Sequence, residues 1–412
     1  MTETRLITDM AFVRLWTSNT ASGLATWALP FVLGLLIVGG DLTAAHAGLA
    51  LAARTVGFVL AMPVGGVLAD RSGPRRMIFG AGLLAALGIG PIISGLAGFG
   101  GLAAILAGAA IAGFGQGACR ASYQAIVPRI VADAQRQPAN AAMTISIRVS
   151  VLAGPMVATA AALQFGAMAT LLGIAALWTL AALLPTWPPR GEGTINEPLT
   201  LPRFIAELGE GFEEARRHPW FMAGLAALTV VIAFGYSVTS VLLPQISEAH
   251  FGGPKLLAAS VTAYTVGALF GALIIARWKP RDIGWLALAS LSLYGLVPLS
   301  LLFPGHLVVP LTAFFIAGVG IEFFNVPWFT ALQREIPEKR LARVSSVDFL
   351  FSYGLAPLAL AGLTPLTQIL GVAPVLWICA GICIGSPLGA MLVTGSRNFS
   401  RAPVEAHKIS AE

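Results

Sequence analysis

Charged residues are scarce in this 412-residue chain, and their scarcity sets the class of protein. Only 11% of the residues are charged, whereas 57% are hydrophobic, and the mean hydropathy is +0.82. An ordinary soluble domain carries about 25% charged residues, and a water-soluble fold could not bury so much apolar surface. The sequence therefore predicts that a lipid bilayer is the solvent, and that helices of about 20 residues are the building unit.

The chain also lacks the residues that enzymes and pumps require. No Gly-x4-Gly-Lys-Ser/Thr nucleotide loop occurs, which argues against an ATP-driven pump. The five histidines are scattered through expected loops and the tail, so neither a metal site nor a cofactor is predicted. The three cysteines lie in apolar runs and are expected to be buried and unpaired: Cys119, Cys379 and Cys383. We expect a protein that is not an enzyme.

Twelve apolar segments account for most of the chain, and several of the connections between them are very short. They predict an all-α membrane protein with six-helix halves at 1–186 and 220–395, a linker at 187–219 and a tail at 396–412. The segments are 12–38, 44–69, 77–98, 101–124, 141–164, 167–186, 220–246, 256–276, 283–303, 307–329, 346–369 and 372–394.

Basic residues outnumber acidic ones by 25 to 19, yet a lipid surface and not nucleic acid is the expected partner. With the N-terminus in the cytoplasm, three arginines fall inside helices and Lys255 alone falls in an outside loop. All the other basic residues then lie on the cytoplasmic side, as the positive-inside rule requires. We expect an inner- or plasma-membrane protein with both termini in the cytoplasm. The polar segment Met1–Ala11 indicates no cleaved signal.

The linker contains apolar residues at helical spacing, with charged residues between them. This pattern predicts an amphipathic helix on the cytoplasmic surface that connects the two halves. A plain connection is favoured over a regulatory surface. The apolar positions are Leu201, Phe204, Ile205, Leu208 and Phe212.

Short motifs recur in corresponding places of the two halves, which indicates a diverged duplication. A Gln-x-x-x-Pro sequence precedes a basic loop at Gln124 and again at Gln333. Four further residues recur at a constant offset of 206: Gly65, Arg71, Pro74 and Arg75 return as Gly271, Arg277, Pro280 and Arg281.

The charged turn after the second apolar segment carries a family resemblance. Residues Gly66–Arg76 read G-x-L-A-D-R-x-G-x-R-R, and this pattern resembles the loop between helices 2 and 3 of the major facilitator superfamily. Gly154-Pro155 is similar to the Gly-Pro antiporter motif of its exporters. Phe12–Trp16 and Trp328–Ser346 resemble its enterobactin-exporter and multidrug-efflux branch. The resemblance implies proton-driven export of an amphipathic compound, and a cavity lined by helices 1, 4, 7 and 10.

Four charged residues lie well inside expected membrane helices, where charge usually marks a pathway or a gate. Arg54, Arg120 and Arg148 stay charged at any working pH, whereas Glu322 can gain and lose a proton. We therefore predict that Glu322 is the proton carrier. The alternative is a structural ion pair between Glu322 and one of the three arginines.

Asp70 is predicted to act as a conformational latch in the charged turn. The resemblance implies that this loop packs against helix 11 when the cytoplasmic side is closed. Helix 11 is expected to open with Ser345-Ser346, and a helix N-terminus there would stabilise the Asp70 carboxylate. The predicted gate also includes the turn residue Gly73 and the helix kink at Gly154-Pro155. Its arginines either pair with cytoplasmic acids or only set the topology: Arg71, Arg75 and Arg76.

Several aromatic residues and one amide are candidates for contact with an amphipathic substrate, although aromatics on membrane helices more often face lipid or other helices. They are Trp27, Phe31, Phe234, Tyr236, Phe324, Asn325 and Trp328. The combined expectation is a monomeric exporter of a drug-like or siderophore-like molecule in exchange for protons. A proton-coupled importer of a metabolite and a non-transporting receptor or scaffold are the alternatives.

The predicted topology can be tested by labelling single cysteines in a variant without the native ones. A cysteine at Gly252 should react with an impermeant reagent in intact cells, because its loop is expected outside. A cysteine at Gly191 should react only after the cells are opened. Labelling of position 191 in intact cells would reject the orientation.

Overall fold

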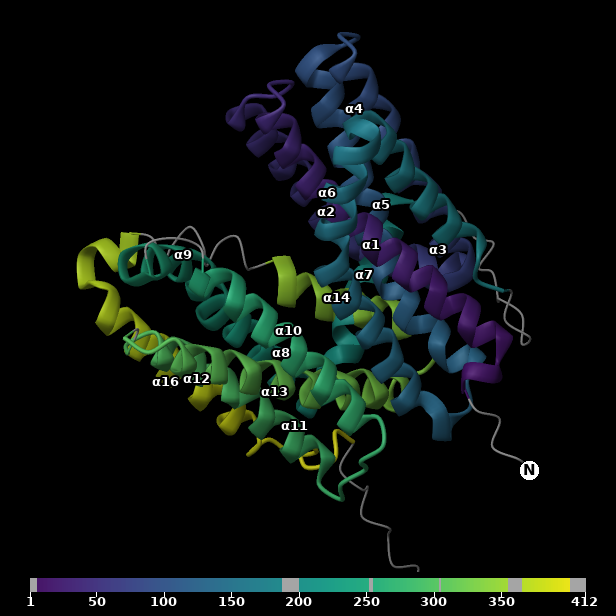
Figure 1. Ribbon diagram of the computed structural model, residues 1–412. Helices are drawn as coiled ribbons and strands as arrows, with labels where there is room; N and C mark the ends of the chain where they lie inside the picture. The colour runs from purple at the N-terminus through teal and green to yellow at the C-terminus, as the bar shows by residue number, and fades with distance from the viewer. Residues whose placement is uncertain (1–5, 187–199, 252–254, 304, 355–364, 401–412) are drawn as a thin grey trace, which may run out of the picture.

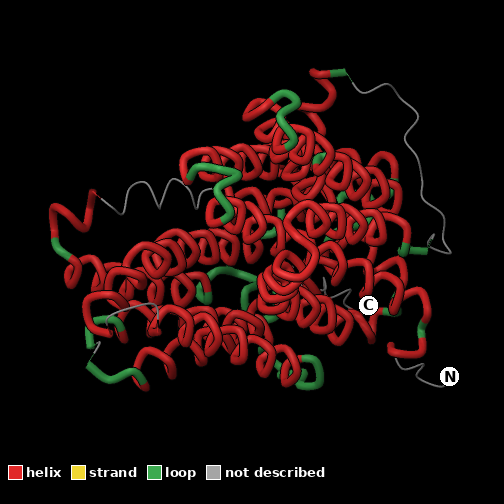
Figure 2. The backbone as a smooth tube through the Cα atoms, turned by 45° about the horizontal axis from the view of Figure 1, so that its top comes forward, coloured by secondary structure: helices red, strands yellow, loops and turns green. Residues whose placement is uncertain are grey.

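The computed structural model describes residues 6–186, 200–251, 255–303, 305–354 and 365–400, and every regular element in these ranges is a helix (Figure 1, Figure 2). Ten of the described helices are long and apolar enough to cross a membrane. One of them, Asp133–Leu183, contains two expected segments, because Gly166 at φ 82° interrupts it. Segment 346–369 lies partly outside the described residues. The predicted all-helical fold is confirmed.

The first half begins at a capped helix and contains one sharp turn. The Asp9 side chain accepts a hydrogen bond from the Ala11 amide at 2.9 Å, which caps α1. The chain reverses at Gly73, whose φ of 94° suits only glycine, and Pro74 then opens α3. The helices are α1 Met10–Val38, α2 Ala44–Ser72, α3 Pro74–Leu87, α4 Ile89–Leu96, α5 Gly101–Ile130 and α6 Arg136–Leu183, with short turns η1 Leu6–Thr8 and η2 Asp133–Gln135.

The second half follows the amphipathic linker helix α7 Leu201–Arg216. A π-helical turn, η3 Val231–Tyr236, interrupts its first span, and such turns are frequent at functional sites. The other elements are α8 Pro219–Val230, α9 Ser237–Phe251, α10 Lys255–Ile275, α11 Ile283–Ser292, η4 Leu293–Gly295, α12 Leu296–Ser300, α13 Val308–Glu335, α14 Leu341–Gly354 and α16 Val372–Ala390.

The two halves meet at one end and diverge towards the other, so that the molecule has the shape of a V (Figure 1). We call the joined end the linker end, because α7 lies there in contact with α14 and α2. At the opposite end, α4 of the first half and α9 of the second half are well separated (Figure 1).

Polar side chains connect the halves at the linker end. Gln137 Nε2 donates to the carbonyl oxygens of Ile275 and Trp278 at 2.5 and 2.9 Å. The two repeated Gln-x-x-x-Pro motifs also meet, because Gln333 Nε2 donates to Gln124 O at 3.1 Å. Gln333 Oε1 in turn accepts from Asn140 Nδ2 at 2.9 Å. The duplicated motifs therefore form part of the contact between halves.

Gly66 brings α2 against α14 at this contact. A Cβ atom at Gly66 would lie 2.6 Å from Ser346 Cβ and 2.9 Å from Ala342 O, which is closer than atoms can pack. We expect Gly66→Ala to weaken the closed linker end. Cysteines at Ala141 and Ile275, which share one buried cluster across the halves, should then cross-link at least several-fold more slowly.

The matched control is Gly80→Ala, because a Cβ there meets no atom within 4 Å. Gly80→Ala should leave the cross-linking rate unchanged. Equal rates for Gly66→Ala and the wild-type chain would show that this contact does not hold the end closed.

Candidate functional site

Asp70 connects the two halves through the first turn of α14. Its Oδ1 and Oδ2 accept hydrogen bonds from the backbone amides of Ala342 and Arg343, each at 3.2 Å. Oδ2 also pairs with Arg343 Nε at 2.9 Å. The carboxylate thus occupies a helix N-terminus, where free amides and the helix dipole stabilise negative charge. Asp70 thus lies beside the N-terminus of a helix, as expected, although not beside the residues expected there.

The predicted partner residues were wrong by about one helical turn. The helix begins at Leu341, so Ser345 and Ser346 lie inside α14 and do not cap it. Ser346 Oγ instead donates to Arg343 O at 2.7 Å. The sequence Ser345-Ser346 is a good capping signal, but the carboxylate of Asp70 satisfies the free amides one turn earlier.

The linker helix α7 joins the same gate from the other side. Glu210 accepts from Arg343 Nη1 at 2.7 Å, and Glu214 pairs with Arg340 Nη1 at 2.5 Å. Glu207 forms an ion pair with Arg71 of α2. These three glutamates lie on one face of α7 and contact both halves. The amphipathic pattern predicted the helix but not these pairings, because only the tertiary fold reveals the partners.

The Glu214 link is in place at neutral pH. Burial acts to raise the pKa of Glu214, but the hydrogen bond and charge of Arg340, together with Arg217, outweigh it and hold the pKa below its ordinary value. A carboxylate with a lowered pKa stabilises the fold above its unfolded pKa, and that stabilisation is lost only in acid.

The remaining residues of the predicted gate act within the first half. Arg75 donates to the carbonyl oxygens of Pro185 and Leu183, which ties α3 to the end of α6. Arg76 is exposed. A Cβ on Gly154 would lie 3.0 Å from Trp27 Cβ, so this glycine allows α1 and α6 to approach closely beside Pro155.

A second link between the halves is buried near the middle of the spans. Arg148 of α6 contacts Glu322 Oε1 of α13 through Nε at 2.7 Å and Nη2 at 2.5 Å. Glu322 is fully buried. Both residues lie 12 or 13 positions from the linker ends of their helices, which is about 18 to 20 Å along each axis. Arg148 is therefore the partner among the three predicted arginines.

Tyrosines from three elements surround this ion pair. The Arg148 guanidinium lies 5.7 Å from the centroid of the Tyr264 ring, a cation–π contact. Tyr236 and Tyr353, each about half exposed, are close enough to interact with the Arg148 charge. Sequence analysis selected Tyr236 only. Tyr264 and Tyr353 gave no signal, because a single tyrosine in an apolar run does not show which way it faces.

A small recess lies in the wall of the first half. It measures about 20 Å³ and is lined by residues of α1, α5 and α6, among them Trp27, Gln116 and Arg120. Arg54 of α2 adjoins it, donating through Nη2 to Gln116 Oε1 at 2.6 Å and to Thr26 O at 3.1 Å. Three residues predicted for the site, Arg54, Arg120 and Trp27, therefore lie at or beside one recess.

The aromatic residues and the amide predicted to line a cavity lie in different environments. Phe31 is exposed, and Phe234 and Asn325 are half-buried. Phe324 and Trp328 are fully buried and stack with ring centroids 5.1 Å apart, so they pack in the interior of the second half. Phe399, assigned to the tail, is also fully buried there, 5.4 Å from Trp328. Aromatic rings gain more from mutual packing here than from exposure.

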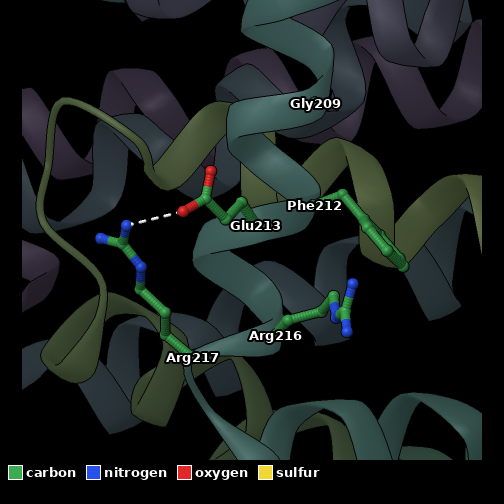
Figure 3. Close-up of a pocket in the computed structure, with 5 residues that line it drawn as sticks. All are labelled: Gly209, Phe212, Glu213, Arg216 and Arg217. Carbon is green, nitrogen blue, oxygen red and sulfur yellow. Dashed lines mark hydrogen bonds and ion pairs between the residues drawn. The ribbon is translucent and has the colours of Figure 1, made fainter.

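A larger recess of about 430 Å³ lies on the outer face of α7 (Figure 3). Figure 3 shows Glu213 and Arg217 pointing to one side and Phe212 and Arg216 to the other. Glu213 and Arg217 form an ion pair at 2.9 Å. All five lining residues belong to α7, and the recess includes none of the residues that pair between the halves.

The fold and the buried charges define an integral membrane protein that crosses the bilayer many times. Residues 15–361 match the Major Facilitator Superfamily, and this match spans most of the chain. The chain belongs to that superfamily. It is therefore a secondary transporter of a small molecule and not an enzyme.

Solved structures share this fold at low identity. A bacterial homologue of the iron transporter ferroportin in an outward-facing state is 16% identical, with a TM-score of 0.72 over 94% of this chain and 99% of that chain. The transporter FucP in the outward conformation is 16% identical, with a TM-score of 0.73 over 97% and 100%. The human organic anion transporter MFSD10 is 17% identical, with a TM-score of 0.70 over 92% and 99%. No curated protein matches the chain.

Asp70→Asn should open the linker end and reduce transport. The amide keeps the size but removes the charge that Arg343 and the α14 amides face. Breaking a buried ion pair costs on the order of 3 kcal/mol, or about a hundredfold in the equilibrium between conformations. The cross-linking rate between cysteines at Ala141 and Ile275 measures this equilibrium directly.

The matched control is Asp282→Asn, which removes an exposed ion pair with Arg397 at 2.6 Å. Exposed pairs contribute little, so this variant should cross-link at the wild-type rate. If Asp70→Asn also behaves like the wild-type chain, Asp70 is not a latch.

Proposed function

We propose that this chain couples the movement of a small amphipathic compound to a proton carried by Glu322, and that it exports that compound. The observation behind this proposal is the buried pair Arg148–Glu322, which joins the halves through the proton-binding group itself. Both contacts use Oε1, and Oε2 has no hydrogen-bond partner among the described residues. Oε2 is therefore the oxygen on which a proton can be placed without displacing Arg148.

The proposed mechanism follows from the charge of Glu322. While ionised, it holds α13 to α6 through Arg148. Protonation removes the attraction, and without it the two halves are free to rock about the site. An unpaired Arg148 would remain at membrane depth, which is costly. Protonation of Glu322 therefore shifts the equilibrium between the two arrangements of the halves by as much as the ion pair contributes, on the order of 3 to 5 kcal/mol.

We infer that the V shape is the outward-facing state and that the linker end faces the cytoplasm. Two observations support this inference. The halves separate away from α7 (Figure 1), and the solved relatives in outward states share the fold. The basic residues gathered at the linker end agree with a cytoplasmic location. Alternating access would then break the Asp70 gate and the Glu322 pair in turn.

Export is favoured by the exporter-like Gly154-Pro155 and by the resemblance to the efflux branch. Import is the second candidate, and the specific observation behind it is the pair of arginines at the recess, Arg54 and Arg120, discussed below. Transport direction in inverted against right-side-out vesicles separates the two.

Glu322→Gln should remove the response to pH. The amide resembles the protonated acid but cannot release a proton, so the conformational equilibrium should be fixed. In the wild-type chain we expect the cross-linking rate between cysteines at Ala141 and Ile275 to change between about pH 5 and pH 8. In Glu322→Gln only the pH dependence of the cysteine thiols themselves should remain. In proteoliposomes, the variant should also fail to accumulate dyes against a gradient.

Glu213→Gln is the matched control, because Glu213 pairs with Arg217 on the exposed face of α7. It should keep the wild-type pH response. A pH response retained by Glu322→Gln would reject Glu322 as carrier. The next residue to test would then be Asp348, also buried, whose Oδ1 accepts from Trp328 Nε1 at 3.0 Å.

A further inference from the structure

Arg54 and Arg120 carry charge at membrane depth with no acid to balance it. Among the described residues, neither forms an ion pair with a carboxylate, whereas Arg148 is balanced by Glu322. Arg54 lies 10 residues from one end of α2 and 18 from the other, so it is far from both membrane surfaces. Its charge also acts on Arg120. A charge inside the membrane usually pairs or serves a ligand pathway.

The unsatisfied polar atoms around these arginines are all donors. Arg54 only donates hydrogen bonds, so it fixes the amide of Gln116 with Oε1 towards itself. Gln116 Nε2 is left without a partner, although Gln116 is 3% exposed and lines the recess. Trp27 Nε1 and Arg54 Nε are likewise buried without partners. Each buried donor left unpaired costs about 1 to 3 kcal/mol.

Two positive charges and three unpaired N–H groups require an acceptor that carries negative charge. The recess of about 20 Å³ is partly open and admits roughly one water molecule, whose place one oxygen of an acidic group can take. Water can accept a hydrogen bond there but cannot neutralise the two guanidinium groups. A carboxylate, sulfonate or phosphate group supplies both the oxygen acceptors and the charge, and guanidinium groups bind such oxygens strongly.

We propose that the transported compound is an organic anion whose acidic group binds at Arg54, Arg120 and Gln116, with its apolar part against Trp27. This inference rests on the proposed function, because it assigns a substrate class to the same transport site. It also gives the first half a role distinct from that of Glu322, which belongs to the second half. The anion balances the charge that the protein leaves unbalanced.

The inference can be tested by binding to the full-length protein in nanodiscs of phosphatidylcholine. The probes are naphthalene-2-sulfonate, the cation 2-naphthyltrimethylammonium and neutral naphthalene, which share one apolar body. The sulfonate should raise the Tm with the logarithm of its concentration above its Kd, and the other two should not. Arg120→Gln and Arg54→Gln should each weaken sulfonate binding about tenfold to a hundredfold.

Arg120→Gln is the more informative variant, since Arg120 makes no hydrogen bond among the described residues and its loss should leave the Tm of the empty protein unchanged or higher. The matched control is Arg397→Gln, which removes the same charge at an exposed position. It should bind the sulfonate like the wild-type chain. Arg54→Lys retains the charge and should keep part of the affinity, even if Arg54→Gln unfolds.

Three results would overturn the inference. They are a Tm shift by the cation equal to that by the sulfonate, no shift by the sulfonate, and wild-type sulfonate affinity in Arg120→Gln. Loss of the shift when phosphatidylglycerol is added to the nanodiscs would assign the site to a lipid headgroup and also reject a soluble anion. None of these results bears on the pH response of Glu322, so the proposed proton coupling stands or falls separately.

Discussion

The free-energy cost of placing a charge in the hydrocarbon core of a membrane determines much of the arrangement of this molecule. An ionised group at membrane depth needs a partner, and for Glu322 and Asp70 that partner comes from the opposite half. Glu322 of α13 meets Arg148 of α6, and Asp70 of α2 meets the first turn of α14. The requirement to pair charges therefore also determines where the two halves are joined. Apolar packing builds each half, whereas charge decides how the halves contact each other.

The two links differ in what can release them. The gate at Asp70 combines backbone amides with Arg343, and Arg343 is also held by Glu210 of the linker helix. A proton on Asp70 would break its ion pair, but Arg343 would stay paired with Glu210, so one proton would not release the whole network. The pair at Glu322 has one carboxylate and one guanidinium, so one proton or one competing ligand is enough. A ligand shifts a conformational equilibrium only by its difference in affinity for the two states, and Glu322 lies where such a difference can arise.

Features that depend on local composition could be predicted from the sequence. Features that depend on which residues meet in the tertiary structure could not. The spans follow from apolar runs, and Asp70 beside a helix N-terminus follows from a charged turn. The start of that helix was misplaced because Ser345-Ser346 resembles a cap, although Asp70 satisfies the amides of Ala342 and Arg343. Phe324 and Trp328 were assigned to the substrate because aromatic spacing does not reveal that Phe399 returns to pack against them. The glutamates of α7 have partners 126 to 136 residues away.

The sign of the coupling between anion and proton links the substrate class to the direction of transport. The recess proposed to hold the anion is lined by Ile147, the chain neighbour of Arg148, so an anion there would repel an ionised Glu322 and favour its protonated form. By linkage, protonation of Glu322 must strengthen anion binding by the same factor. Proton and anion then travel together, which is the logic of uptake down a proton gradient. Export in exchange for protons requires a coupling of the opposite sign, in which protonation of Glu322 weakens substrate binding. The unbalanced arginines at Arg54 and Arg120 therefore favour import as strongly as Gly154-Pro155 favours export, and the sign of that linkage selects between them.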